Sequence, residues 1–201
     1  MGRHREFDEA EIVEKAMRAF WKNGWRDATP QRLIEATGLS RSSLYATFGS
    51  KQGLFLAALD LYVAQQQSFL AQLLADGPLR EGLERMYVLM VDNMRPGGEG
   101  MTCLVASSLL EVPAEDSETI ARVARGQAQM TNVFEARFQR AIDEGELDGT
   151  RTAGELARFI ATVNNGIQIA ARARASAAHL RSIAQMAMDT VGTRLPKRRP
   201  S

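Results

Sequence analysis

The chain has very few of the residues that build disulfide frameworks and metal centres. Its 201 residues include one cysteine, Cys103, and two histidines, His4 and His179. One cysteine cannot form an internal disulfide, and such low usage is typical of proteins in a reducing cytoplasm. Because nitrogen and sulfur ligands are so scarce, we expect no metal site. Phosphate-binding and dinucleotide-binding glycine motifs are absent as well, so we expect no cofactor.

Long apolar runs are also missing. No stretch approaches the roughly 20 apolar residues of a membrane helix, and residues 1–8 (MGRHREFD) lack the apolar segment of a secretion signal. We therefore expect a cytoplasmic protein without membrane contact. The sequence shows no evident carboxylate pair and no histidine beside a nucleophile, so we expect no catalytic residues and no enzyme.

Positive charge is scarce for a nucleic-acid coat protein, since the formal net charge is only +1. The segment from Lys22 to Lys51 nevertheless has five bases against two acids, a local net charge of +3. A fluctuation of this size also occurs by chance in thirty residues. Because the chain as a whole carries almost no net charge, any binding to DNA must come from a local segment such as this one.

Helical periodicity runs through almost the whole chain. Apolar residues, 45% of the total, recur at helix spacing, and glycine or proline separates the periodic segments. We find no convincing strand and no internal repeat. This pattern predicts an all-α fold of about nine helices. The expected helices cover residues 12–23, 30–37, 41–48, 51–74, 78–94, 103–111, 117–144, 152–175 and 178–191.

Residues 29–51 predict a helix, a tight glycine turn and a second short helix. Thr29 and Pro30 suit an N-cap and a first helical position, and Gly38 suits the turn. The second helix has few apolar residues, so it must be held by its neighbours. Its polar side chains then face outward, as in a helix that reads the major groove of DNA. A solvent-exposed helical corner with capping serines is the alternative.

The order of sequence motifs in this region resembles that of a known family. The first helix ends in Asn-Gly-Trp, and the segments Ala36-Thr37-Gly38-Leu39-Ser40, Ser43-Leu44-Tyr45 and Ser50-Lys51 follow in order. In these motifs the first third of the chain, residues 7–62, resembles the N-terminal domain of TetR-type transcriptional regulators from bacteria. The remainder resembles the family in the number and length of its helices.

The resemblance implies a homodimer that binds a palindromic operator in double-stranded DNA and acts as a repressor in the bacterial nucleoid. It implies a helix-turn-helix DNA-binding domain at 1–55 and an effector-binding and dimerisation domain at 56–195. The composition of residues 196–201 predicts a basic, disordered tail. A small, mostly apolar effector would release the operator. The DNA contacts implied by the matching positions are Thr29, Gln31, Arg41, Ser42, Ser43, Tyr45, Thr47 and Lys51.

The last two helices carry broad apolar faces. Residues 152–175 and 178–193 are the segments through which the resemblance implies dimerisation, as a four-helix bundle with the partner copy. An ordinary intramolecular core is the alternative.

An effector pocket is expected among apolar residues of the second half. Methionine and aromatic side chains recur there at helical spacing, and methionine adapts to varied apolar ligands. The same spacing is also typical of a plain core. The pocket candidates are Met86, Tyr87, Met90, Cys103, Phe134, Phe138 and Asn164.

Cys103 offers a second way to control the protein. The frame Met101-Thr102-Cys103-Leu104-Val105 resembles one branch of TetR-type repressors, in which some members sense electrophiles or oxidants through this cysteine. A helix N-terminus favours the thiolate form. The alternative function is therefore a redox-sensing or electrophile-sensing repressor, and the alternative role for Cys103 is a small core residue.

Overall fold

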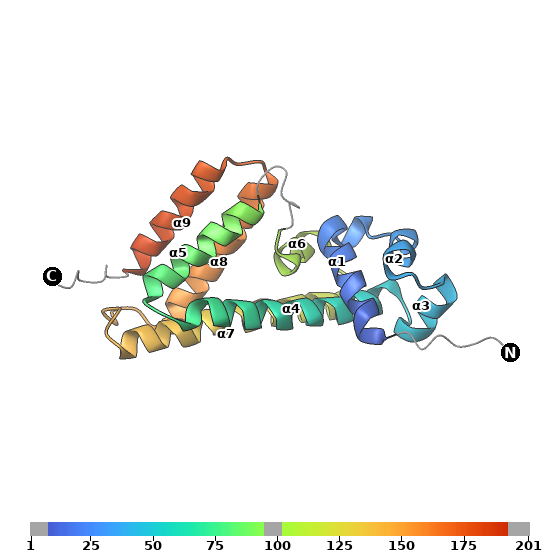
Figure 1. Cartoon of the computed structure of the whole chain (residues 1–201), viewed down its shortest axis with the longest axis horizontal. Helices are drawn as coiled ribbons and strands as arrows, with labels where there is room; N and C mark the ends of the chain where they lie inside the picture. The colour runs from blue at the N-terminus through green and yellow to red at the C-terminus, as the bar shows by residue number, and fades with distance from the viewer. Residues whose placement is uncertain (1–7, 95–101, 193–201) are drawn as a thin grey trace. The chain divides into compact units, whose positions relative to one another are not determined.

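The computed structural model describes residues 8–94 and 102–192, and within these ranges it contains nine α-helices and no strand (Figure 1). The all-α prediction is confirmed. The predicted tail at 196–201 lies outside the described residues. The helices are α1 (Glu9–Asp27), α2 (Pro30–Thr37), α3 (Arg41–Phe48), α4 (Lys51–Ala75), α5 (Leu79–Asn93), α6 (Leu104–Glu111), α7 (Ser117–Asp143), α8 (Ala153–Arg172) and α9 (Ala177–Val191).

Side-chain caps fix several helix starts. The Thr29 hydroxyl accepts from Arg32 N and the Ser40 hydroxyl accepts from Ser43 N, as expected from the N-cap preference for small hydroxyl residues. One boundary differs from the sequence prediction. Gly24, expected to end α1, instead marks a kink (φ 77°, ψ 174°), and α1 continues to Asp27.

The described residues form two compact units. The first contains residues 8–64 and 103–126, and the second contains residues 65–94, 102 and 127–192. The core of the first unit is built around Phe20, Leu33, Leu44, Leu54 and Phe55, each at most 2% exposed. The Phe20 and Phe55 rings meet edge to face with centroids 5.0 Å apart. This core holds α1, α2 and α3 against the first part of α4.

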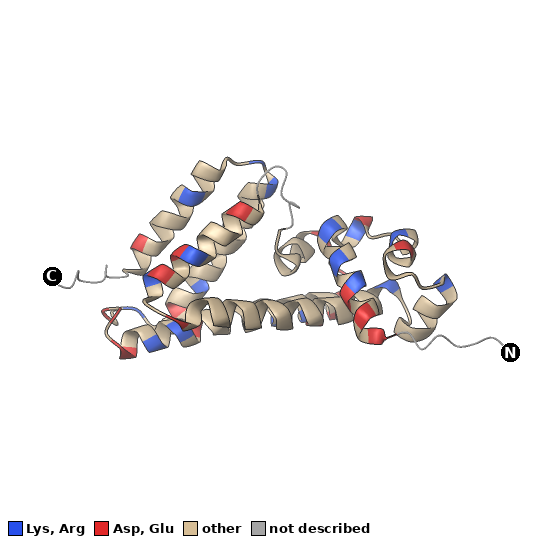
Figure 2. Ribbon diagram, in the orientation of Figure 1, with Lys and Arg blue, Asp and Glu red and all other residues tan. Residues whose placement is uncertain are grey.

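The second unit has a core of its own. Leu83, Phe138, Ile160 and Ile167 are completely buried there, and α9 packs against both α5 and α8. Helix α4 contributes its first part to one unit and its last part to the other. Its only charged residues are Lys51 and Asp60, so most of its ribbon is tan in Figure 2. Among the described helices, none combines the length and apolarity needed to cross a membrane.

Candidate nucleic-acid interface

The turn between α2 and α3 is made by a left-handed glycine. Gly38 has φ 73° and ψ 8°, and its N–H donates to Ile34 O at the end of α2. Leu39, 2% exposed, follows and packs into the core of the first unit. Ser40 then caps α3. A residue without a Cβ tolerates positive φ at little cost, which explains why the tight turn falls at Gly38.

Helix α3 contributes one buried residue, Leu44, to the core. Tyr45 and Phe48 pack against that core while half-buried, whereas Arg41 and Thr47 are exposed. With so little buried surface, α3 is held by its neighbours and presents a polar face to solvent. This arrangement agrees with the sequence analysis.

Arg41 is oriented by an aromatic neighbour one turn along α3. Its guanidinium carbon lies 5.8 Å from the centroid of the Tyr45 ring, within range of a cation–π contact. Among the described residues, no carboxylate lies within ion-pair distance of Arg41. The guanidinium is therefore available for the two-pronged contact that arginine makes with guanine or phosphate.

The serines at the start of α3 form a cluster of hydroxyls. Ser40 Oγ lies 2.9 Å from Ser42 Oγ and 2.8 Å from Ser43 Oγ, and it accepts from Ser43 N. These three contacts use the one proton and both lone pairs of Ser40 Oγ, whereas the hydroxyls of Ser42 and Ser43 retain acceptor capacity. The two predicted contact residues, Ser42 and Ser43, are thus tied to the cap in this structure.

Two further predicted contacts lie on or just before α2. Gln31 is exposed and donates from Nε2 to Glu35 Oε1 over 2.9 Å. Thr29 is exposed, and its hydroxyl is already used to cap α2. The first unit therefore brings Thr29, Gln31 and the α3 residues onto neighbouring helices of one motif.

Lys51, the predicted phosphate contact at the start of α4, also makes contacts within the protein. Its Nζ donates to Trp25 O over 2.6 Å and lies 4.6 Å from the Trp25 ring centroid. Burial lowers the pKa of Lys51, and the negative charge of Asp27 partly opposes that change. One of the three ammonium donors is thus engaged within the protein.

Glu111 of α6 completes this arrangement, and sequence reasoning missed it. Its Oε2 accepts from Trp25 N over 2.7 Å. Trp25 directly follows the kink at Gly24, so this carboxylate holds the backbone at the break in α1. No local sequence signal marks Glu111, because its partner is 86 residues away.

Arg32 is a second residue that the sequence analysis did not single out. Its Nη1 donates to Asn23 Oδ1 (3.3 Å) and to Asp27 O (3.1 Å). It therefore ties α2 to the end of α1, which fixes the first two helices of the motif relative to each other.

The predicted pocket residues fall into both units. Met86, Tyr87, Phe134 and Phe138 are buried in the second core, where the two phenylalanine rings stack 6.4 Å apart, and Met90 packs against it. Asn164, on α8, is half-buried. Within the described residues, Tyr87 Oη and Asn164 Oδ1 are buried without a hydrogen-bond partner. Burial raises the pKa of Tyr87.

Cys103 belongs to the first unit, apart from the other pocket candidates. It is half-buried at the start of α6 and hydrogen-bonded to the hydroxyl of Tyr62. Burial, the nearby thiol and this hydrogen bond raise the pKa of Tyr62, while a hydrogen bond with the Leu104 backbone acts in the opposite direction.

Helices α8 and α9 pack against each other and still leave apolar side chains in solvent. Ile169 of α8 is 52% exposed and Met186 of α9 is 67% exposed. Their neighbours Ile167 and Ala187 point into the core. Both helices thus have a buried face and additional exposed apolar positions.

Comparison with known proteins identifies the family. Residues 12–58 match the family described as bacterial regulatory proteins, tetR family, and residues 78–187 match the tetracyclin repressor-like C-terminal domain. The chain belongs to the TetR family. Members of this family are helix-turn-helix transcriptional regulators, so the prediction that the chain is not an enzyme is confirmed.

Individual TetR proteins align with most of the chain. The uncharacterized HTH-type transcriptional regulator YezE of Bacillus subtilis (strain 168) is 31% identical over 80% of this chain and 84% of its own length. The HTH-type transcriptional repressor ComR of Escherichia coli (strain K12) is 29% identical over 91% and 88%. A cysteine mutant of the TetR family regulator CifR, solved with 26-bp operator DNA, superposes with a TM-score of 0.82 at 29% identity and covers 94% of this chain and 100% of its own.

Proposed function

We propose that this TetR protein is a homodimeric repressor that reads a palindromic operator through α3. The observation that carries the proposal is the polar surface of α3, which has one buried residue, an exposed Arg41 and a left-handed Gly38 before it. The operator complex of CifR and the repressor name of ComR support it. In this proposal residues 1–55 bind DNA and residues 56–195 bind the effector and the partner copy.

The contact set of the proposal combines α2, α3 and the first residue of α4. Arg41 and Tyr45 approach base edges, and Gln31 and Ser42 lie at bases or the adjacent backbone. Thr29, Thr47 and Lys51 approach phosphates, with Ser43 beside them. Phosphate contacts fix register while base contacts provide specificity.

Dimerisation in this proposal uses residues 152–175 and 178–193. The exposed Ile169 and Met186 support this choice, because both apolar side chains become buried if the two helices pack against their copies. Two reading helices on one dimer then match two half-sites of a palindrome.

The proposed effector is a small, mostly apolar molecule bound among Met86, Tyr87, Met90, Phe134 and Phe138. The unpartnered Tyr87 Oη and Asn164 Oδ1 support a ligand with both a donor and an acceptor group. Release requires that the effector prefer a state in which the two reading helices no longer fit successive major grooves.

Operator binding is tested by fluorescence anisotropy on the DNA upstream of the protein's own gene. We expect Arg41→Ala to weaken binding by about 1–3 kcal/mol and to relax specificity at one base pair. Arg125→Ala is the matched control, because Arg125 is an exposed arginine of α7. Equal effects of the two substitutions would rule out a reading role for Arg41.

A second candidate function is switching through Cys103, and the hydrogen bond with Tyr62 supports it. Modification of the thiol would break a contact inside the core of the first unit. The test treats the wild-type protein and Cys103→Ser with a quinone or hypochlorite. Release of operator DNA only by the wild-type protein would support it, and release by both would contradict it.

A further inference from the structure

A groove of about 440 Å³ lies between α4 and α7 in the second unit. Its volume falls within the range of small-molecule sites, about 300–1,000 Å³. The ten residues that line it include two arginines, three amides and no acid; the other five are alanine, leucine and valine. The lining therefore combines an apolar wall with positive charge.

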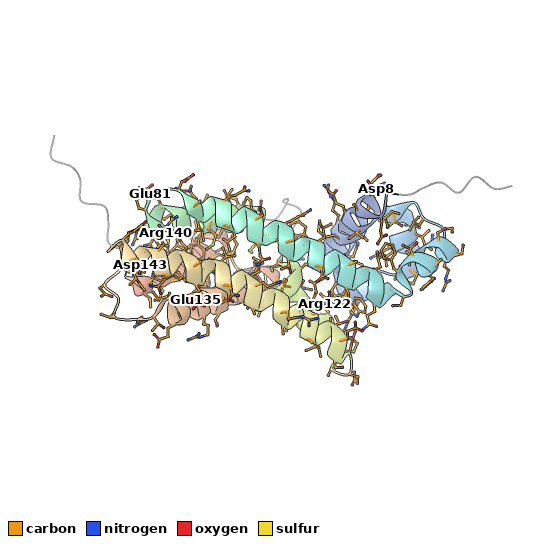
Figure 3. The ribbon with its side chains drawn as sticks, turned by 90° about the horizontal axis from the view of Figure 1, so that it is seen from below. Asp8, Glu81, Arg122, Glu135, Arg140 and Asp143 are labelled. Atoms are coloured by element: carbon orange, nitrogen blue, oxygen red, sulfur yellow. The ribbon has the colours of Figure 1, made fainter. Side chains whose placement is uncertain are left out.

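Within this unit, α4 and α7 run parallel and side by side (Figure 3). Gln67 Nε2 donates to Gln129 O (3.3 Å), and further along both helices Arg137 Nε donates to Leu74 O (3.1 Å). Both arginines of the groove, Arg137 and Arg140, lie where α4 ends.

Arg137 is a buried cation with an unused donor. Its side chain is 5% exposed. Nε donates to Leu74 O, and Nη2 donates to Gly77 O (3.1 Å) and Glu146 Oε1 (2.8 Å). Nη1 is buried and has no acceptor among the described residues. A buried donor without an acceptor is costly, so a movement of the guanidinium that brings this N–H to an acceptor in the groove would be favourable.

Arg140 provides a second unused donor three residues later. Its Nη2 donates to Ala75 O over 2.6 Å. Its Nε is buried and makes no hydrogen bond within the described part of the chain. Glu144 Oε2 lies 3.9 Å from that Nε and is 56% exposed, so solvent screens this ion pair. Residues three apart share a helix face, so both arginines flank the same end of the groove.

We propose that this groove binds a free monocarboxylate with a short alkyl chain. The guanidinium groups of Arg137 and Arg140 attract the carboxylate, and once they turn toward it they donate charge-assisted hydrogen bonds, which are stronger than neutral ones. The alkyl chain lies along Ala71, Val133 and Ala136. The site is separate from the proposed effector pocket, because none of the residues that line the groove is one of the pocket candidates.

Isothermal titration calorimetry of the full-length protein with octanoate, without DNA, tests this inference independently of operator binding. We expect saturable binding of octanoate. Octan-1-ol has the same chain without the charge, and octylamine carries the opposite charge, so both should bind at least about tenfold more weakly, a difference of 1.4 kcal/mol. Equal binding of octan-1-ol, or no saturation with octanoate, would overturn the proposal.

Three variants locate the site. Arg140→Gln removes the second donor, and Ala136→Leu fills the groove from an exposed helix position; each should weaken octanoate about tenfold or more. Arg125→Gln, an exposed arginine of the same helix, should leave the affinity within about twofold. Thermal midpoints check that each variant is folded. Unchanged octanoate binding by folded Ala136→Leu would place the ligand elsewhere and refute the inference.

Discussion

Lys51 Nζ donates to the carbonyl oxygen of Trp25 over 2.6 Å and lies 4.6 Å from the centroid of the same residue's ring. One side chain thus fixes the start of α4 against the end of α1. Among the described residues only one of the three ammonium donors has a hydrogen-bond acceptor, so two can serve a phosphate. Lys51 therefore combines a structural contact with its proposed DNA contact.

We predict that Lys51→Met weakens binding about equally on every DNA sequence. The loss of one phosphate contact should reduce the slope of log affinity against log salt by about 0.9. Anisotropy titrations between about 50 and 200 mM salt measure this slope. Arg151→Gln, at an exposed position of the second unit, is the control. An unchanged slope for Lys51→Met would leave Lys51 with only its contact to Trp25.

Around Gly24, the local features of the fold could be predicted from the sequence, whereas the long-range contacts could not. The helix caps and the turn are encoded by residues at those positions, namely Thr29, Pro30, Gly38 and Ser40. The helix-turn-helix motif could therefore be predicted from the sequence. The hydrogen bond between Trp25 N and Glu111 joins residues far apart in the chain, and no periodicity encodes it. The groove could not be predicted from the sequence either. Its periodicity places Arg137 and Leu74 on two separate helices and does not indicate that these helices are in contact.

We predict that Gly24→Ala is more destabilising than Gly38→Ala. Both glycines have positive φ, but Gly24 also has ψ 174°, a region that only glycine readily adopts. A Cβ at Gly24 would lie 2.4 Å from Glu111 Oε2, whereas one at Gly38 would meet nothing within 4 Å. We expect about 1–2 kcal/mol for Gly38→Ala and a larger loss, by at least about 1 kcal/mol, for Gly24→Ala.

Urea denaturation measures both losses in stability. Introducing Gly24→Ala into both wild type and Glu111→Ala separates the steric contribution from the backbone strain, because Glu111→Ala already lacks both the carboxylate that the new Cβ would meet and the acceptor of Trp25 N. A smaller loss for Gly24→Ala than for Gly38→Ala would contradict the kink described here.

The hydroxyls of Tyr87 and Tyr62 differ in partners, although burial raises the pKa of both. Tyr87 Oη has no partner among the described residues, whereas Tyr62 contacts Cys103 and the Leu104 backbone. At pH 7 we expect Tyr87→Phe to stabilise the protein by about 1 kcal/mol and Tyr62→Phe to destabilise it by a similar amount. Thermal denaturation of the two variants shows whether each substitution raises or lowers stability. A loss of stability in Tyr87→Phe would show that the Tyr87 hydroxyl has a hydrogen-bond partner.

The raised pKa of Tyr87 makes the stability of the protein depend on pH. Above the ordinary tyrosine pKa of 10.0 the unfolded chain loses the Tyr87 proton, while the folded chain keeps it because its pKa is raised. The folded state then binds more protons than the unfolded state, so stability falls as the pH rises above 10. Tyr87→Phe should lose part of this dependence. Urea midpoints at pH values on either side of 10 measure it, and an identical decline in wild type and variant would contradict the raised pKa.

The ion pair between Arg137 and Glu146 should contribute far more to stability than the pair between Arg140 and Glu144. Glu146 accepts from Arg137 Nη2 (2.8 Å) and also from Leu79 N (2.5 Å). Glu146→Gln keeps the shape but leaves the buried Arg137 without its counter-charge, so we expect a loss of about 3–5 kcal/mol. Glu144→Gln removes an exposed partner 3.9 Å away and should cost at most about 0.5 kcal/mol. Urea midpoints of the two variants decide the matter, because similar losses would mean that Arg137 is solvated rather than buried.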